Sequence, residues 1–220
     1  MSTHPSLRDR LRSIPVFSGE LPKFDPDAAP PTPLPLLVSW LEGAIDAGVS
    51  QPHAMTLGTA SAAGEPSART LLLKDVDDDS VWFASMSTGP KGHDIEENPR
   101  AALTLYWREQ GRQVRIVGAV EPGPRDVSEA DFLARSPGAR ASAIAGRQSE
   151  PIAPTEIVEE MVAEARDAIE FEPGFVPRGW TAYRVIPSSI EFWQADRERD
   201  QIRLRYVRVN DAWERQILWP

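Results

Sequence analysis

The chain has no cysteine among its 220 residues, which excludes disulfide bonds and thiolate metal ligands. Histidine is also scarce. His4, His53 and His93 are scattered and fit no metal-ligand spacing, and no Ser/His/Asp order indicates a hydrolase. We therefore expect neither a metal site nor acyl-transfer chemistry.

Long apolar runs and an excess of basic residues are absent too. No apolar run is long enough to span a bilayer, and the N-terminal sequence MSTHPSLRDRLRSIP lacks the apolar core of a secretory signal. We therefore expect a cytoplasmic protein without a membrane partner. Lys+Arg number 24 against 33 Asp+Glu, which gives a net charge of -9. Because such a surface repels a polyanion, nucleic acid is not an expected partner.

Length and composition favour one folded domain preceded by an arm. A chain of 220 residues can bury one sizeable core but is short for two enzymatic domains. Prolines are concentrated between Pro15 and Pro35, where they remove backbone donors and disfavour helix and central strand. We predict a flexible, Pro-rich arm over residues 1–34 and a domain over 35–220, which opens with an amphipathic helix over 36–48.

The rest of the chain alternates between β-prone runs and turn-forming clusters. Strands are predicted over residues 55–60, 68–76, 81–85, 101–107, 113–120, 182–186, 189–194, 203–209 and 213–218. Helices are predicted over residues 92–98, 128–135 and 155–169. This set predicts an α+β fold that is mainly β, with an antiparallel barrel, closed or nearly closed, and a few peripheral helices.

Two cations, Arg69 and Lys74, flank a short apolar run and could form an anion site in this acidic protein. Side chains five positions apart in a regular strand point to opposite faces, so joint action requires a bulge or a ligand that passes around the strand end. The alternative is that both side chains reach solvent or deter edge pairing.

A second candidate anion site is the run from Ser85 to Gly92. It supplies hydroxyls, glycines and the ammonium of Lys91 at the start of a predicted helix. Unpaired N–H groups and the helix dipole favour a phosphate there. The spacing is not that of a Walker loop, and such runs are also ordinary caps and turns.

Single polar and aromatic residues give weaker signals. Gln113 begins an apolar strand, and Gln148 and Ser149 follow a stretch of small residues. Their amide and hydroxyl groups can bind a polar heterocycle, or serve only as local hydrogen bonders. Taken one at a time, Trp180 and Trp193 are expected in the core.

The order of the segments along the chain carries more information than any one of them. RTLLLK, STGPKGHDIEENPRAAL, GRQVRIVG, RQSEP and IEFWQ follow one another, and Arg199 and Arg203 come after the last. From about Pro35 to Pro220 this order resembles the pyridoxamine 5′-phosphate oxidase family, including its phenazine-biosynthesis branch. The resemblance implies a Greek-key split β-barrel and a homodimer that holds FMN at the subunit interface. It assigns the FMN contacts to Arg69, Lys74, Ser85, Lys91, Gln113, Gln148, Ser149, Trp193 and Arg203, with Arg69 and Lys91 as phosphate partners.

The substrate side of the pattern is altered. In the vitamin-forming oxidases an Arg-x-His pair follows the Phe-Trp-Gln motif, whereas this chain has Arg199 and Gln201 there. Those enzymes also carry a tyrosine, an arginine and a serine in a substrate-phosphate cluster, where this chain has Asp131, Arg135 and Ala139. An aspartate repels a phosphate dianion, and an alanine cannot donate to it. The expected substrate-binding residues are Lys74, Arg135 and Arg199.

Two further segments, Val49–Met55 and Leu105–Glu109, resemble the phenazine branch more than the vitamin enzymes. We therefore predict an FMN-dependent oxidase that takes a hydride from a small molecule, such as a reduced phenazine-like heteroaromatic, and passes the electrons to dioxygen. Arg199 is the predicted substrate-facing cation, and Gln201 can hydrogen-bond the substrate but cannot act as an acid or base. Two alternatives stay open: an authentic pyridoxal 5′-phosphate-forming oxidase, and a flavin-binding module without catalysis.

Overall fold

The computed structural model describes residues 5–17, 19–152, 155–196 and 201–220. Its elements in chain order are α1 (Leu7–Arg12), α2 (Pro33–Asp46), β1 (Ala54–Ala60), β2 (Pro66–Leu72), β3 (Asp75–Val76), β4 (Val81–Met86), α3 (Pro90–Glu97), β5 (Arg100–Trp107), η1 (Arg108–Gln110), β6 (Arg112–Pro122), α4 (Arg125–Leu133), α5 (Pro137–Ala145), α6 (Thr155–Phe171), β7 (Trp180–Gln194), β8 (Ile202–Val209) and β9 (Ala212–Ile217). Within these ranges no helix combines the length and the apolar character needed to cross a membrane.

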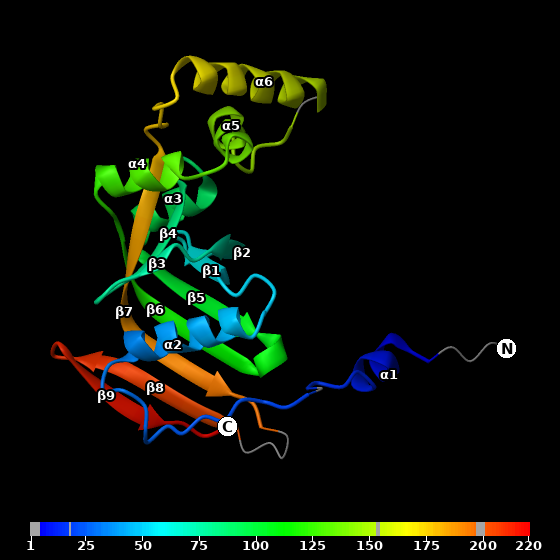
Figure 1. Cartoon of the computed structure of the whole chain (residues 1–220), viewed down its shortest axis with the longest axis vertical. Coiled ribbons are helices and arrows are strands. Elements are labelled where there is room, and N and C mark those ends of the chain that lie inside the picture. Colours follow the sequence, from blue (N-terminus) through cyan, green and yellow to red (C-terminus); the bar gives the residue numbers. More distant parts are fainter. Residues whose placement is uncertain (1–4, 18, 153–154, 197–200) are drawn as a thin grey trace.

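One antiparallel sheet, nine-stranded within the described residues, builds the body of the protein (Figure 1). Neighbouring strands follow the order β2-β1-β5-β6-β7-β4-β3, while β8 pairs with β7 and β9 with β8. Because β2 also lies against β4, the sheet curls into a partly closed barrel. The predicted α+β split-barrel fold is confirmed.

The run 68–76 was predicted as one strand, and this is wrong. β2 ends at Leu72, and β3 begins at Asp75. Between them, the backbone N–H of Leu73 donates to His53 O, directly before β1, and the backbone N–H of Lys74 donates to Trp82 O in β4. The chain therefore changes partner strand at these two residues, which no periodicity in the sequence marks.

The runs 182–186 and 189–194 were predicted as two strands, but they form the single long strand β7. Pro187 lies between them, opposite Gly118, at a shift in the register of the β6–β7 pair. Bulges accommodate a proline within a sheet because a ladder hydrogen bond is already missing there. β7 therefore continues through Pro187 and reaches both ends of the barrel.

Helix boundaries also differ from those predicted. α2 begins at Pro33, inside the Pro-rich segment, since proline is tolerated in the first turn where its missing N–H has no intrahelical acceptor anyway. α1 and α5 were not predicted. The sequence of α5, PGARASAIA, consists mostly of small residues and gives little apolar periodicity.

The core lies between α2 and the strands. Along β5 alternate residues, Leu103 and Leu105 among them, are fully buried, because successive side chains of a strand point to opposite faces. Trp40 of α2 makes edge-on contacts with Phe24 and Phe192, with ring centroids 5.0 and 5.2 Å apart. Each such side chain stabilises the fold by roughly 1.5–3 kcal/mol through burial.

The second half of the Pro-rich segment is fixed to the domain. Phe24 and Ala29 pack against the core, the Tyr206 hydroxyl donates to Pro30 O at 2.7 Å, and Arg215 donates to Ala29 O at 2.8 Å. α1 projects away from the barrel (Figure 1). Flexibility of the arm and a boundary at residue 34 stay predictions.

α5 and α6 form a helical pair at one end of the molecule (Figure 1). They pack on each other through Ala141, Ala165 and Ile169, a small apolar cluster separate from the main core. Arg140 of α5 is buried beneath them and donates to Pro173 O at 2.6 Å. This pair positions α5 beside β2 and β4, where it lines a cavity.

Candidate functional site

The first group of predicted site residues gathers at the start of α3. Lys91 lies in the first turn, is only 5% exposed, and donates from Nζ to Gln148 Oε1 at 2.6 Å. Gln148 follows α5 and lies against Gly89, where an added Cβ would be 2.7 Å from its Oε1. Lys91 forms no ion pair in the described part of the chain. A buried ammonium without a carboxylate is suited to an external anion.

Arg69 adds a second cation beside Lys91. Its guanidinium donates to Thr59 Oγ1 at 2.7 Å and to Ser67 Oγ at 2.6 Å, which fixes it on one side of β2. Burial, and then the charge of Arg69, lower the pKa of Lys91 to about 8. Within the described residues no side chain caps the N-terminus of α3, and its first turn carries no acidic residue. The hydroxyls of Thr59 and Ser67 also donate to Asp94 Oδ2, so this carboxylate offsets part of the charge of Arg69. Buried Lys91, Arg69 and the helix N-terminus together favour a phosphate.

A cavity of about 480 Å³ opens between β2, β4 and α5. Four of the predicted site residues line it: Lys74, Ser85, Arg135 and Gln148. Thr70, Leu71 and Leu72 of β2 also line it, whereas Arg69 does not and instead hydrogen-bonds to Leu57 O of β1. Because β2 ends at Leu72, Lys74 does not continue the alternation of this strand, and the two cations lie at adjoining but different places.

Asp131, which the sequence singled out only as unfavourable for phosphate, organises one wall of this cavity. Its Oδ1 lies 3.0 Å from Lys74 Nζ, and its Oδ2 accepts from Trp180 Nε1 at 3.0 Å. Trp180 is buried as expected and also lines the cavity. No local spacing in the sequence marks this arrangement, because both partners of Asp131 lie far from α4 along the chain.

Arg135 is held over the indole of Trp180, with its Cζ 4.4 Å from the ring centroid. It donates from Nη2 to Ala139 O at 3.3 Å, while its Nε is buried and has no hydrogen-bond partner within the described residues. Burial lowers the pKa of Arg135, and Asp131 opposes that shift. The guanidinium is therefore held at the cavity wall by Trp180 and Ala139.

A second group of predicted residues lies at the other end of β7. Gln113 pairs with Trp193, and Trp193 with Arg203, so the three form one row across β6, β7 and β8. Trp193 Nε1 donates to Gln201 Oε1 at 3.0 Å. Arg203 is oriented by Glu191, with Nη2 to Oε1 at 2.9 Å. Residues paired in this way share a face of the sheet, so this row presents an indole, an amide and a guanidinium together.

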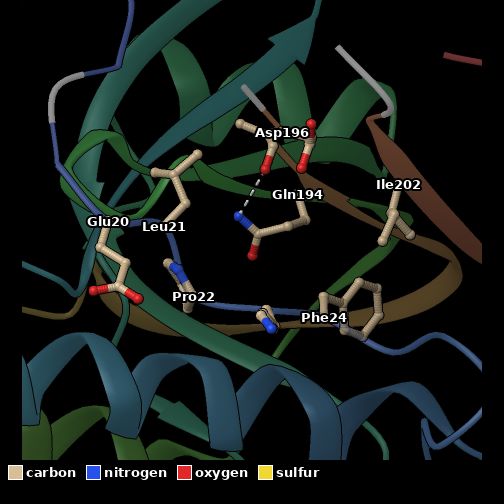
Figure 2. A pocket seen from close by; sticks show the side chains of 9 residues that line it. Glu20, Leu21, Pro22, Phe24, Gln194, Asp196 and Ile202 are labelled. Atoms are coloured by element: carbon tan, nitrogen blue, oxygen red, sulfur yellow. Dashed lines mark hydrogen bonds between the residues drawn. The ribbon is translucent and has the colours of Figure 1, made fainter. Parts of the chain in front are cut away.

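A second cavity, of about 760 Å³, lies at the adjacent ends of β7 and β8, where Gln194 and Ile202 face the opposite side of the sheet from this row (Figure 2). Figure 2 shows the arm residues Glu20, Leu21 and Phe24 around it, together with Gln194 and Ile202 from β7 and β8. Gln194 is buried and donates to Gln110 O at 3.1 Å, so its amide is part of the wall. The Pro-rich arm therefore borders this part of the protein.

The predicted site residues form two separate groups. Trp180, which lines the cavity beside α5, and Trp193, in the row across β6, β7 and β8, stand at opposite ends of β7, about 40 Å apart at about 3.3 Å per residue. The first group contains Arg69, Lys74, Ser85, Lys91, Arg135 and Gln148, and the second contains Gln113, Trp193, Gln201 and Arg203.

The two other predicted site residues are Arg199 and Ser149. Arg199 lies outside the described residues. Ser149 follows Gln148 with a φ of 71°, a left-handed conformation that is uncommon for serine, and its side chain is exposed.

Comparison with known proteins decides the family. The model of the family described as "Pyridoxamine 5'-phosphate oxidase" matches residues 41–168, and that of the "Pyridoxine 5'-phosphate oxidase C-terminal dimerisation region" matches residues 180–220. The chain belongs to the pyridoxamine 5′-phosphate oxidase family. This confirms the resemblance inferred from the order of the sequence segments.

Relatives in this family carry the name "Pyridoxine/pyridoxamine 5'-phosphate oxidase". The protein from Rubrobacter xylanophilus is 42% identical over 194 residues, which is 88% of this chain and 89% of that protein. The protein from Myxococcus xanthus is 36% identical over 87% of this chain and 93% of its own length. These names indicate an oxidoreductase family.

Solved structures agree on the fold. PhzG from Burkholderia lata 383, in complex with tetrahydrophenazine-1-carboxylic acid, matches with a TM-score of 0.85 and 32% identity over 92% of this chain and all of that one. An FMN-binding, pyridoxamine 5′-phosphate oxidase-related protein from Nostoc punctiforme matches with a TM-score of 0.72 at 16% identity, a likeness of fold alone.

Proposed function

We propose that this chain is an FMN-dependent oxidase of the pyridoxamine 5′-phosphate oxidase type, whose substrate site is altered toward a reduced, phenazine-like heteroaromatic. The observation that carries the proposal is the division of the predicted flavin residues into two groups, one around Lys91 and the cavity beside α5 and the other in the row of Gln113, Trp193 and Arg203. In a homodimer, the first group of one protomer and the second group of its partner complete one site. The family match over residues 180–220 supports such a dimer.

The residues at the start of α3 fit the phosphate of FMN. Lys91 and Arg69 provide two charges, and Lys91 is a buried cation that lacks a carboxylate partner among the described residues. Ser85 is buried at the end of β4 nearby and can add a hydroxyl donor. The row of Gln113, Trp193 and Arg203 presents amide and guanidinium donors suited to a polar heterocycle.

Flavin supplies the hydride acceptor when it is bound, and reoxidation by dioxygen then gives hydrogen peroxide. The protein orients the substrate and screens it from water. Arg135 anchors an anionic group of the substrate in the cavity beside α5, and Lys74, which also lines this cavity, adds to its positive charge. Arg199 is proposed as the second substrate-facing cation, and Gln201, tied to Trp193, as a hydrogen-bonding partner without acid or base function.

A mixed dimer tests the shared site. Arg69→Ala disables the first group and Arg203→Ala the second, so each homodimer should be inactive. Coexpression should restore about a quarter of the wild-type active sites, because a mixed dimer has one site built from two intact halves. If the site lay within one chain, every chain would still be defective, and coexpression would restore nothing.

A second function is favoured by the names of the relatives, namely formation of pyridoxal 5′-phosphate from its pyridoxine or pyridoxamine form. Oxygen consumption by the FMN-loaded protein separates the two. Turnover of pyridoxine 5′-phosphate, with formation of pyridoxal 5′-phosphate, would assign the vitamin reaction. Turnover of a dihydrophenazine carboxylate alone would assign the altered one, and flavin uptake without turnover of either would indicate a binding module.

A further inference from the structure

The cavity beside α5 carries an unusual balance of charge for an anion site. Lys74 and Arg135 contribute two positive charges, and Asp131 contributes one negative charge in direct contact with Lys74. Behind Lys74, Asp75 and Asp77 line a second cavity of about 340 Å³ together with Asp131. The net charge that faces a ligand is therefore about one positive unit.

Asp131 holds its position through both carboxylate oxygens. Oδ1 pairs with Lys74 Nζ at 3.0 Å, and Oδ2 accepts from Trp180 Nε1 at 3.0 Å. Its side chain is only 15% exposed. If Lys74 turned toward a ligand, it would leave a largely buried carboxylate without its cation, which is costly.

Arg135 is the cation that remains for the ligand. It is stacked on Trp180 and its Nε–H has no partner within the described residues. Ala139 and Ala143 of α5 line the cavity without a side-chain donor, and Ser142 beside them donates to Gly138 O at 3.0 Å. The other polar side chains on its walls, Thr70, Ser85 and Gln148, are neutral. One guanidinium matches one carboxylate, whereas a phosphate monoester carries about 1.5 to 2 negative charges at pH 7.

We propose that Asp131 determines substrate specificity: by retaining Lys74 it adapts the cavity to a substrate anchored by a single carboxylate and selects against a phosphate dianion. This inference rests on the proposed function and specifies its substrate class. Asp131 acts here through Lys74 and through the net charge of the cavity.

Two probes with the same ring measure this preference without turnover. Benzoate carries one negative charge and phenyl phosphate carries close to two, and neither is oxidised by a flavin. Their dissociation constants for the FMN-loaded dimer are measured by calorimetry at pH 7.5. Wild-type protein should bind benzoate at least as tightly as phenyl phosphate.

Asp131→Asn keeps an acceptor for Trp180 and frees Lys74. The ratio of the two dissociation constants should move toward phenyl phosphate by about tenfold, the effect of removing one nearby charge from a partly solvated site. Asp131→Glu retains the carboxylate and should keep the wild-type ratio. Asp126→Asn is the matched control, since it makes the same charge change on an exposed residue of the same helix.

An unchanged ratio in Asp131→Asn, or an equal shift in Asp126→Asn, would overturn the inference. If Asp131→Asn does not fold or load FMN, Asp131→Ser provides the same charge change for the same measurement. Flavin uptake by the wild-type protein is measured first. Failure to take up FMN would overturn the proposed function, whereas a flavin-loaded protein with an unchanged ratio would overturn only the role of Asp131.

Discussion

Lys91 should make the affinity for FMN depend on pH. Burial, and then the charge of Arg69, lower its pKa from 10.5 to about 8 in the flavin-free chain. A phosphate dianion beside the ammonium favours the charged form and raises this pKa again. FMN binding therefore takes up a proton above pH 8, so affinity should decrease as the pH rises.

The size of the effect follows from the pKa. At pH 7 about nine in ten Lys91 side chains are charged, and at pH 9 about one in ten, so FMN affinity should fall about tenfold over this range. Phosphate, whose second pKa is about 6, stays a dianion throughout. The flavin-free protein should show the opposite trend in stability, since its unfolded state binds more protons between pH 8 and 10.5. It should gain up to about 3 kcal/mol of unfolding free energy across that window.

Quenching of FMN fluorescence, titrated at pH 7, 8 and 9, measures the affinity. Lys91→Arg keeps a charge at all three values and should remove the pH dependence, while Lys91→Met should bind weakly and show none. A wild-type affinity that is constant from pH 7 to 9, or an equal fall in Lys91→Arg, would refute the reasoning.

Three further variants test the site and the core. Gly92→Ala should lose FMN binding, because the added Cβ would collide with Ser87 O, whereas Gly138→Ala, whose Cβ meets nothing within 4 Å, should bind as wild type in the same fluorescence titration. Phe192→Ala should lower the unfolding free energy by about 3–5 kcal/mol in urea denaturation, since Phe192 is fully buried. A decrease in unfolding free energy no larger than that of a typical surface substitution would contradict its central place in the core. Arg199→Ala should reduce turnover while leaving the flavin absorbance spectrum unchanged, and equal turnover would remove Arg199 from the proposed mechanism.

Much of the fold could be predicted because local patterns and core burial agree. Alternation along β5 gives the buried face that contains Leu103 and Leu105, and the apolar spacing of α2 gives a helix that buries Leu37 and Trp40. The predicted strand boundaries were wrong where a neighbouring strand altered the local structure. Pro187 is tolerated in β7 because a register shift in the β6–β7 pair lies beside it, and the sequence of β7 alone does not reveal that partner.

The sequence by itself determined the chemical inventory of this protein: a chain without cysteine, the ordered segments that carry Arg69, Lys91, Trp193 and Arg203, and membership of the pyridoxamine 5′-phosphate oxidase family. Side-chain chemistry and spacing along the chain are local properties, so they can be read from the sequence without knowledge of the fold.

Only the tertiary structure decided which of these residues meet. It brought Gln148 to Lys91 across 57 positions of sequence, aligned Gln113, Trp193 and Arg203 in one row of the sheet, and brought Asp131 to Lys74. Such distances depend on how strands pair and how helices dock on them. The charge that a ligand meets in the cavity is therefore a property of the folded chain, because it is the sum over groups that approach only after folding.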